Sequence, residues 1–201
     1  MSTDGVDNSR RRFLTAATSV VGAVGTVGLI IPFASSMNPS ARAKAAGAPV
    51  EVDISKLEPG GMITVEWRGK PVWIVRRTKD NMDDLKKNIG HLTDAESGAS
   101  KQPEYAKNFH RSRTDHAEII VMEGICTHLG CSPKYRPELA PADLGDDWMG
   151  GYFCPCHGSK FDLSGRVYSG VPAPSNLPIP PHMYLSETVI LVGLDTAEGA
   201  A

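Results

Sequence analysis

The sequence predicts a mostly β domain that is preceded by a single transmembrane helix and a flexible segment. Three observations support this fold class: an uncharged apolar run near the N-terminus, a stretch of small residues after it, and several β-rich runs further on. Glycine (20 residues) and proline (15 residues) are frequent, which favours turns and short strands over long helices. The formal net charge of -2 gives no indication of nucleic-acid binding.

The N-terminal 33 residues have the composition of a membrane anchor. An uncharged stretch of 21 residues runs from Phe13 to Phe33 and follows three arginines, Arg10 to Arg12. A helix of this length spans about 30 Å, the thickness of the hydrocarbon core of a bilayer, whereas the apolar region of a cleavable signal has only ~7–15 residues. We therefore expect a retained transmembrane helix over residues 13–33 and a cytoplasmic segment over residues 1–12.

The arginines also predict orientation and export route. Positive charge before the span places the N-terminus in the cytoplasm and the rest of the chain in the periplasm, on the bacterial inner membrane. The arginine pair followed by Phe13-Leu14 resembles a twin-arginine export signal, a route for proteins that take up cofactors before they cross the membrane. The alternative is an ordinary secretory signal anchor with a chance run of arginines.

Residues 34–50 are small and polar and contain nothing that would build a core. A flexible linker of this length reaches about 20–25 Å, so we expect a hinge that lets the domain formed by residues 51–201 sample a substantial volume.

Within that domain, hydrophobic patterns predict a few strands and one short helix. The expected helix begins at Asp80-Asn81 and ends at Gly90, and residues 91–113 are expected to form a surface loop. The expected strands cover residues 62–67 and 71–75, which form a hairpin, and residues 116–122 and 188–192.

All four cysteines lie in two short segments that have the ligands of a metal centre. The segments read Cys126-Thr127-His128-Leu129-Gly130-Cys131 and Cys154-Pro155-Cys156-His157-Gly158-Ser159. Thiolates suit iron and zinc, and imidazole suits both metals as well. A structural zinc site needs four ligands and would leave two of these six residues over, and in an exported domain two spare cysteines form a disulfide.

These two segments resemble the cluster-binding loops of the Rieske iron-sulfur subunit of the bacterial cytochrome bc1 complex. The resemblance extends from the arginine segment to about residue 193 and implies an antiparallel β domain with an inserted cluster-binding subdomain at about residues 124–176. It implies that Cys126 and Cys154 bind one iron of a [2Fe-2S] cluster, that His128 and His157 bind the other, and that Cys131 is disulfide-bonded to Cys156.

The resemblance also assigns roles to residues near the ligands. Ser159 matches the hydroxyl donor that hydrogen-bonds the cluster, whereas Phe161 stands where many relatives place a tyrosine, which implies a somewhat lower reduction potential. Residues 170–174 (Gly-Val-Pro-Ala-Pro) resemble the loop that shields the cluster, and Leu129 is expected to be an exposed apolar contact. The other histidines, His91, His110, His116 and His182, lie outside any ligand spacing.

The implied function is that of the redox subunit of a ubiquinol-cytochrome c reductase. The implied partners are quinol and the cytochrome b and cytochrome c1 subunits of a dimeric multi-subunit complex, and His128 and His157 are the residues expected to act on quinol. Three alternatives remain open: a subunit of a b6f-type complex, a Rieske ferredoxin or oxygenase component, and a zinc-stabilised membrane-anchored domain.

Overall fold

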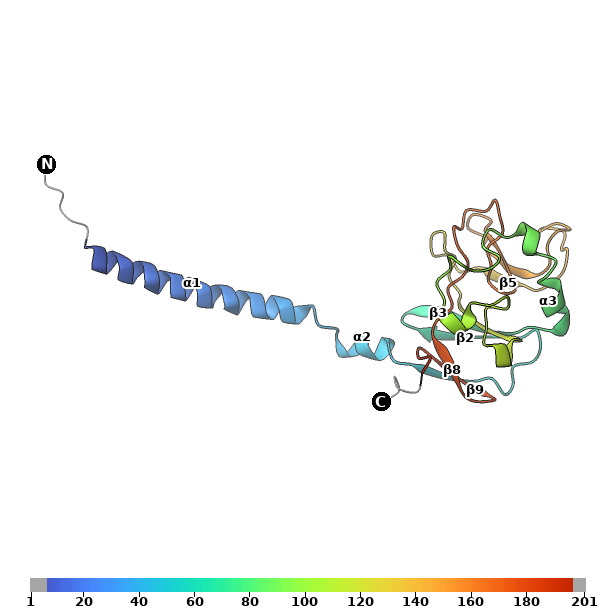
Figure 1. The fold of residues 1–201 in the computed structure, drawn as a ribbon, viewed down its shortest axis with the longest axis horizontal. Helices are drawn as coiled ribbons and strands as arrows, with labels where there is room; N and C mark the ends of the chain where they lie inside the picture. Colours follow the sequence, from blue (N-terminus) through green and yellow to red (C-terminus); the bar gives the residue numbers. More distant parts are fainter. Residues whose placement is uncertain (1–6, 197–201) are drawn as a thin grey trace. The chain divides into compact units, whose positions relative to one another are not determined.

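The computed structural model describes residues 7–196, which divide into two compact units between Ala45 and Ala46 (Figure 1). The first unit contains helices α1 (Asn8–Ser36) and α2 (Ala41–Ala46), the latter ending at the division. The second unit contains, in its described part, strands β1 to β9, helix α3 (Lys79–Asp84) and three short 3-10 turns. The predicted order of long helix followed by an antiparallel β domain is confirmed.

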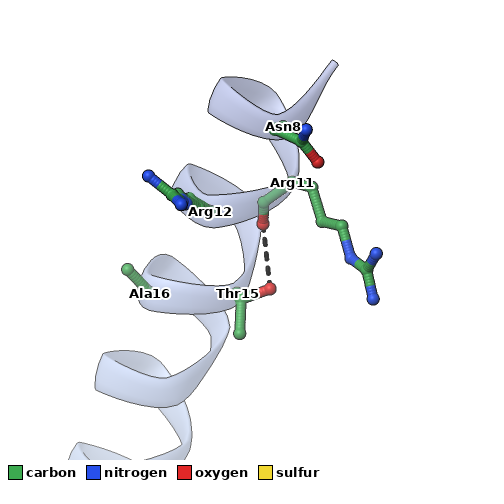
Figure 2. A pocket seen from close by; sticks show the side chains of 5 residues that line it. All are labelled: Asn8, Arg11, Arg12, Thr15 and Ala16. Atoms are coloured by element: carbon green, nitrogen blue, oxygen red, sulfur yellow. Dashed lines mark hydrogen bonds between the residues drawn. The ribbon is translucent and has the colours of Figure 1, made fainter. Parts of the chain in front are cut away.

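Helix α1 is long and apolar enough to cross a membrane, and none of its residues is buried. The Asp7 side chain caps its N-terminus by accepting hydrogen bonds from the backbone of Ser9 and Arg10. Arg11 and Arg12 lie in the first turns and point to different sides of the helix (Figure 2). The helix therefore contains the predicted span and extends beyond it at both ends.

The predicted linker contains one further element. Residues 41–46 form α2, a short helix whose side chains are exposed. A helix of six residues is far shorter than the ~12–15 residues that isolated helices need for stability in water.

The β domain consists of three antiparallel three-stranded sheets. The first sheet has the order β1-β9-β8, the second has the order β2-β3-β4, and the third has the order β5-β6-β7. Their strands are β1 (Val50–Asp53), β2 (Met62–Trp67), β3 (Lys70–Arg76), β4 (Ile119–Glu123), β5 (Lys134–Arg136), β6 (Gly151–Phe153), β7 (Lys160–Asp162), β8 (His182–Ser186) and β9 (Val189–Val192).

The second sheet lies in the middle of the domain (Figure 1), and its strands β3 and β4 are buried on both faces. Val72 and Ile74 of β3 pack with the first sheet, whereas Trp73 and Val75, which alternate with them, pack with the third sheet and the cysteine loops. Successive side chains of a strand point to opposite faces, so a strand with two buried faces is a nearly continuous apolar run. The cysteine loops are thus built on a rigid platform.

Two local predictions are wrong in detail. Helix α3 is capped by Thr78 rather than by Asp80-Asn81. Thr78 and Asn81 form a capping box, in which each side chain accepts a hydrogen bond from the other residue's backbone amide. The predicted single helix also ends at Asp84, and a separate 3-10 turn forms at Ile89–His91.

The expectation of a surface loop over residues 91–113 is only partly correct. The segment contains little regular structure, but Ala106 and Arg111 are fully buried and Leu92 is nearly so. These residues are covered because the segment packs on the third sheet and on the turn that follows β7, as Leu92 does through a bridge to Tyr168.

Candidate metal centre

The first cysteine loop follows β4 and is closed by two backbone hydrogen bonds. The amide of Cys126 donates to the carbonyl of Cys131 at 2.7 Å, and the amide of Gly130 donates to the carbonyl of Cys126 at 3.0 Å. Gly130 has φ +83°, a left-handed conformation that is strained for residues with a Cβ. The glycine thus lets the chain turn back directly after His128 and Leu129.

The second loop connects β6 to β7 and repeats this pattern. The amide of Cys154 donates to the carbonyl of Ser159 at 2.8 Å, and the amide of Gly158 donates to the carbonyl of Cys154 at 2.9 Å. Gly158 has φ +77°. The two loops therefore have the same closed turn, and each carries one cysteine at its start and one histidine near its apex.

The two loops separate thiols from imidazoles. Cys126 and Cys154 are each 2% exposed and are not disulfide-bonded, whereas His157 is exposed and His128 is half-buried. The two imidazole rings lie side by side, with centroids 4.9 Å apart and ring planes at 84°. The predicted ligands are thus brought together, with sulfur inside and nitrogen outside.

This donor set fits an iron-sulfur cluster with mixed ligands. Cys126 and Cys154 belong to the same buried cluster, and the Cys154 thiol is near enough to raise the pKa of the Cys126 thiol. Burial raises the pKa of the Cys126 thiol, and hydrogen bonds from the His128 backbone and the Ser159 side chain oppose this shift. The net effect favours the protonated thiol, and the His128 backbone and the Ser159 side chain are the two neighbours that favour the thiolate.

A disulfide between Cys131 and Cys156 joins the two loops, as the resemblance implies. The sulfur of Cys154 lies within 4.8 Å of both sulfurs of this bond. The three cysteines are close enough to suggest a metal site of their own, but two of them are consumed by the disulfide. Within the described residues, the cysteines left to bind metal are Cys126 and Cys154.

The proline-rich segment is attached to both loops. The buried hydroxyl of Ser159 accepts a hydrogen bond from the amide of Ala173 at 3.1 Å, and the hydroxyl of Thr127 donates to the carbonyl of Ser175 at 2.6 Å. The role of Thr127 was not expected from the sequence, because a lone threonine between two ligands has no periodicity or spacing that would single it out. The segment thus fixes the loops as well as flanking them.

Aromatic side chains form the inner wall of the site. Phe161 is fully buried, faces Tyr152 across β6 and β7, and belongs to the same apolar cluster as Cys126 and Cys154. Tyr152 in turn stacks on Trp73, with ring centroids 5.2 Å apart. The outer side differs, since Leu129 is 72% exposed, as expected for an apolar contact residue.

Two of the remaining histidines, His116 and His182, have partners away from the cysteine loops. His182 is buried, and its Nδ1 lies 3.2 Å from the hydroxyl of Tyr105. The ring of His116 stacks on that of Tyr184 at 3.9 Å. Neither ring contacts the cysteine loops.

Comparison with known proteins agrees with this geometry. Residues 49–181 match the Rieske [2Fe-2S] domain family, and residues 1–40 match the family described as ubiquitinol-cytochrome C reductase Fe-S subunit TAT signal. The chain is 59% identical over 195 residues to the ubiquinol-cytochrome c reductase iron-sulfur subunit of Allochromatium vinosum, covering 97% of this chain and 93% of that protein.

Other relatives have the same description. The ubiquinol-cytochrome c reductase iron-sulfur subunit of Bradyrhizobium diazoefficiens is 44% identical over 186 residues, which covers 92% of this chain and 94% of that protein. A chain of a solved structure, described as Hyperthermophilic respiratory Complex III, aligns with 27% identity and a TM-score of 0.45 over 87% of this chain and 98% of that chain. The sequence matches and the paired loops together place the chain in the Rieske [2Fe-2S] family, among the bacterial ubiquinol-cytochrome c reductase iron-sulfur subunits.

Proposed function

We propose that this chain is the subunit that accepts one electron from quinol in a cytochrome bc1 complex and passes it to a c-type cytochrome. In this proposal Cys126 and Cys154 bind one iron of the [2Fe-2S] cluster, and His128 and His157 bind the other. The observation that carries the proposal is the pairing of two buried thiols with two outward imidazoles on loops of identical backbone pattern. When bound, the cluster supplies a one-electron acceptor whose potential is raised by its two imidazole ligands.

His157 is the residue that we propose to contact quinol. Its side chain is exposed, so a ring nitrogen that is not bound to metal can accept a hydrogen bond from the quinol hydroxyl and then its proton. Leu129, which is also exposed, provides apolar surface beside the histidines for the docking site on cytochrome b. His128, being half-buried, has the secondary role of completing the ligand set and orienting its neighbour.

Electron delivery then requires the β domain to move between quinol and cytochrome c1. Two features support this: the chain divides into two compact units at residue 45, and the segment before β1 contains only the marginal helix α2. We propose that residues 34–50 act as the hinge. Replacing Ala41–Ala46 with a rigid proline-rich segment should slow quinol-to-cytochrome c turnover and leave the cluster spectrum intact, whereas unchanged turnover would argue against a moving domain.

The membrane arrangement follows from the charges around α1. The arginines at its N-terminal end support a cytoplasmic N-terminus, which places the Rieske domain in the periplasm and α1 in the inner membrane. In this arrangement the subunit joins cytochrome b and cytochrome c1 in a dimeric complex.

The decisive measurement is electron paramagnetic resonance of the dithionite-reduced full-length protein. We expect a rhombic signal from a reduced [2Fe-2S] cluster, and His157→Ala should abolish it. His116→Ala is the matched control, because His116 is partly exposed and stacks on Tyr184 away from the loops. A silent, zinc-containing wild-type protein, or a normal signal in the His157 variant, would refute the ligand assignment.

A further inference from the structure

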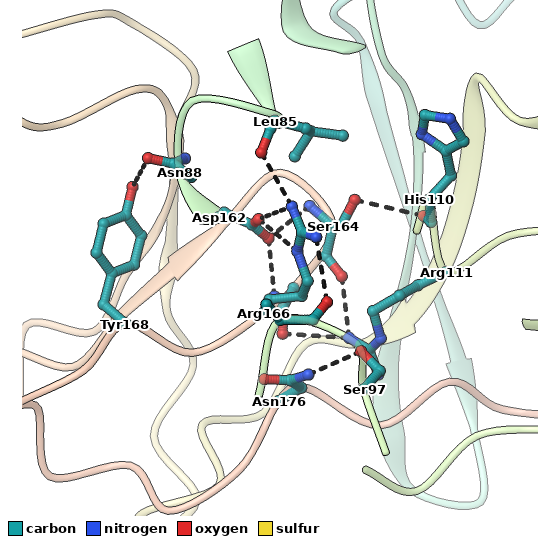
Figure 3. A network of polar contacts seen from close by, with 12 residues as sticks. Leu85, Asn88, Ser97, His110, Arg111, Asp162, Ser164, Arg166, Tyr168 and Asn176 are labelled. Carbon is teal, nitrogen blue, oxygen red and sulfur yellow. Dashed lines mark hydrogen bonds and ion pairs between the residues drawn. The ribbon is translucent and has the colours of Figure 1, made fainter. Parts of the chain in front are cut away.

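Behind the cluster-binding loops, the turn that follows β7 is surrounded by buried charges (Figure 3). Arg111, Arg166 and Asp162 are each 0% exposed, and Arg77 is 2% exposed. Charged groups are seldom fully buried unless each has an oppositely charged partner, because desolvation is costly. Three guanidinium groups and one carboxylate at one place are therefore unusual.

The carboxylate is paired with only one of the three arginines. Asp162 accepts a hydrogen bond from Nε of Arg166 at 2.8 Å and forms an ion pair with its Nη2 at 2.7 Å (Figure 3). The same carboxylate also accepts hydrogen bonds from the backbone amides of Ser164 and Arg166. Asp162 and Arg166 thus neutralise each other.

Arg111 has neutral partners only, within the part of the chain that the structure describes. Its guanidinium donates to the carbonyls of Ser164, Gly165 and Leu177 and to the side-chain oxygen of Gln102, at 2.8–3.2 Å. Burial lowers the pKa of Arg111 to about 10, which leaves the group protonated at neutral pH. Its charge is solvated by backbone dipoles, and the charges of Asp162 and Arg166 act on it with opposite signs.

Arg77 has the same kind of surroundings. Its guanidinium donates to the carbonyls of His110 and Ala117 and to the hydroxyls of Ser112 and Ser164. Burial lowers its pKa to about 10 as well, so it too remains charged. Among the buried groups around this turn, positive charge exceeds negative charge by two.

Nearby exposed groups reduce this excess only partly. The carboxylate of Asp94 interacts with Arg111, but it is half-exposed and accepts hydrogen bonds from the amides of Gly98 and Ala99. Glu118 interacts weakly with Arg77 from the surface. Solvent screens such exposed charges more strongly than buried ones.

Two fully buried aromatic side chains, Phe161 and Tyr152, form an apolar layer that connects these charges to the cysteines. Asp162 directly follows Phe161 in β7, and Phe161 packs with Cys126 and Cys154. Tyr152, in the same apolar cluster, is close enough to Arg77 for the two to interact electrostatically. Since this layer excludes water, the field of the guanidiniums reaches the loops with little screening.

We propose that Arg77 and Arg111 act as buried electrostatic tuning residues that raise the reduction potential of the cluster. This inference rests on the proposed ligand assignment, because the cluster must lie against Cys126 and Cys154. Reduction adds one negative charge, so uncancelled positive charge behind the cysteines stabilises the reduced form relative to the oxidised form. The effect partly replaces the hydroxyl donor that Phe161 lacks.

The test is the midpoint potential of the cluster in the full-length protein. It is measured in a redox titration that is monitored by the visible circular dichroism of the cluster. Arg111→Met removes the charge and the hydrogen bonds, whereas Arg111→Lys, measured in slightly acidic buffer, loses most of these hydrogen bonds and keeps the charge. We expect a lower midpoint in the Met variant and a midpoint near the wild-type value in the Lys variant. Equal midpoints in the two variants, whether shifted or not, would overturn the proposal.

Three further variants guard against misfolding and against a purely structural effect. Asp162→Asn removes the only buried carboxylate of the described network and should move the midpoint in the opposite direction, upwards; a downward shift would contradict the electrostatic account. If Arg111 variants fail to retain the cluster, the Met and Lys pair at Arg77 decides by the same outcomes. A variant with a normal cluster spectrum but an unexpected midpoint contradicts this inference alone. Loss of the wild-type cluster signal would contradict the ligand assignment on which it rests.

Discussion

The exposed tip and the buried interior of the cluster-binding subdomain use the same residue types for opposite purposes. At the tip, which is formed by the ends of the two cysteine loops, His157 and the disulfide-bonded Cys156 are exposed and His128 is half-buried. In the interior, Cys126 and Cys154 are unpaired and buried. Likewise, His182, which is buried in β8 outside this subdomain, is held neutral, whereas His157 faces solvent. The difference shows that environment, more than residue identity, separates a structural cysteine or histidine from those that we propose as ligands.

The largest effect is expected from replacing a buried cysteine sulfur. Cys154→Ser replaces a soft thiolate by a hydroxyl, so the reduced-cluster signal should disappear completely in electron paramagnetic resonance. Met149→Leu, a change at a half-buried residue of the connecting segment, is the control and should keep the signal. Retention of a normal cluster in the serine variant would show that the interior thiols are not the ligands.

The tip disulfide should contribute mainly to stability. Its two cysteines are 25 residues apart. A disulfide that closes a loop of this size stabilises the folded state relative to the unfolded chain by about 3 kcal/mol. The double variant Cys131→Ala, Cys156→Ala should therefore lower the urea-unfolding free energy by about that amount, measured by circular dichroism on the protein in detergent. A change below about 1 kcal/mol would mean that the hydrogen bonds of the two loops hold them together without the clasp.

The neutral interior histidine predicts a pH dependence. Burial lowers the pKa of His182 to about 4, below its ordinary value of 6.5. Between these values the unfolded chain binds more protons than the folded chain, so the stability contributed by this group is complete above the unfolded pKa and is lost as the pH falls towards 4. The loss is on the order of 3 kcal/mol. His182→Gln should flatten the curve of unfolding free energy against pH in this window; an unchanged slope would argue against it.

The smallest effect is expected at Phe161, the buried aromatic residue that packs beside the cysteines. Phe161→Tyr adds a hydroxyl beside the buried cysteines, and a hydrogen bond to a cluster sulfur or ligand should raise the midpoint potential. Phe109→Tyr adds the same group at a ring that stacks against Arg166, away from the cysteines, and serves as the control. An unchanged or lower midpoint in the Phe161 variant would contradict the interpretation of this position.

The sequence predicts those parts of the molecule where physical signals are local. The apolar run from Pro71 to Val75 predicts strand β3. The resemblance of the two cysteine-histidine segments to the Rieske cluster loops implies the disulfide. Strands β5, β6 and β7 were missed, since three-residue strands offer no periodicity to detect. Arg111 was assigned to a surface loop, because a polar residue gives no sign that backbone carbonyls from distant segments will bury it.

The disulfide across the tip also sets an order of events during maturation. In the membrane arrangement proposed above, the cytoplasm is a reducing compartment in which Cys131 and Cys156 stay unpaired, and their disulfide becomes stable after the domain has crossed the membrane. Because Cys126 and Cys154 are buried while Cys156 is exposed, an oxidant outside the cytoplasm reaches the outer pair first. In that arrangement, uptake of iron and sulfide in the cytoplasm precedes formation of the disulfide, so oxidation of Cys131 and Cys156 does not compete for the proposed ligands Cys126 and Cys154.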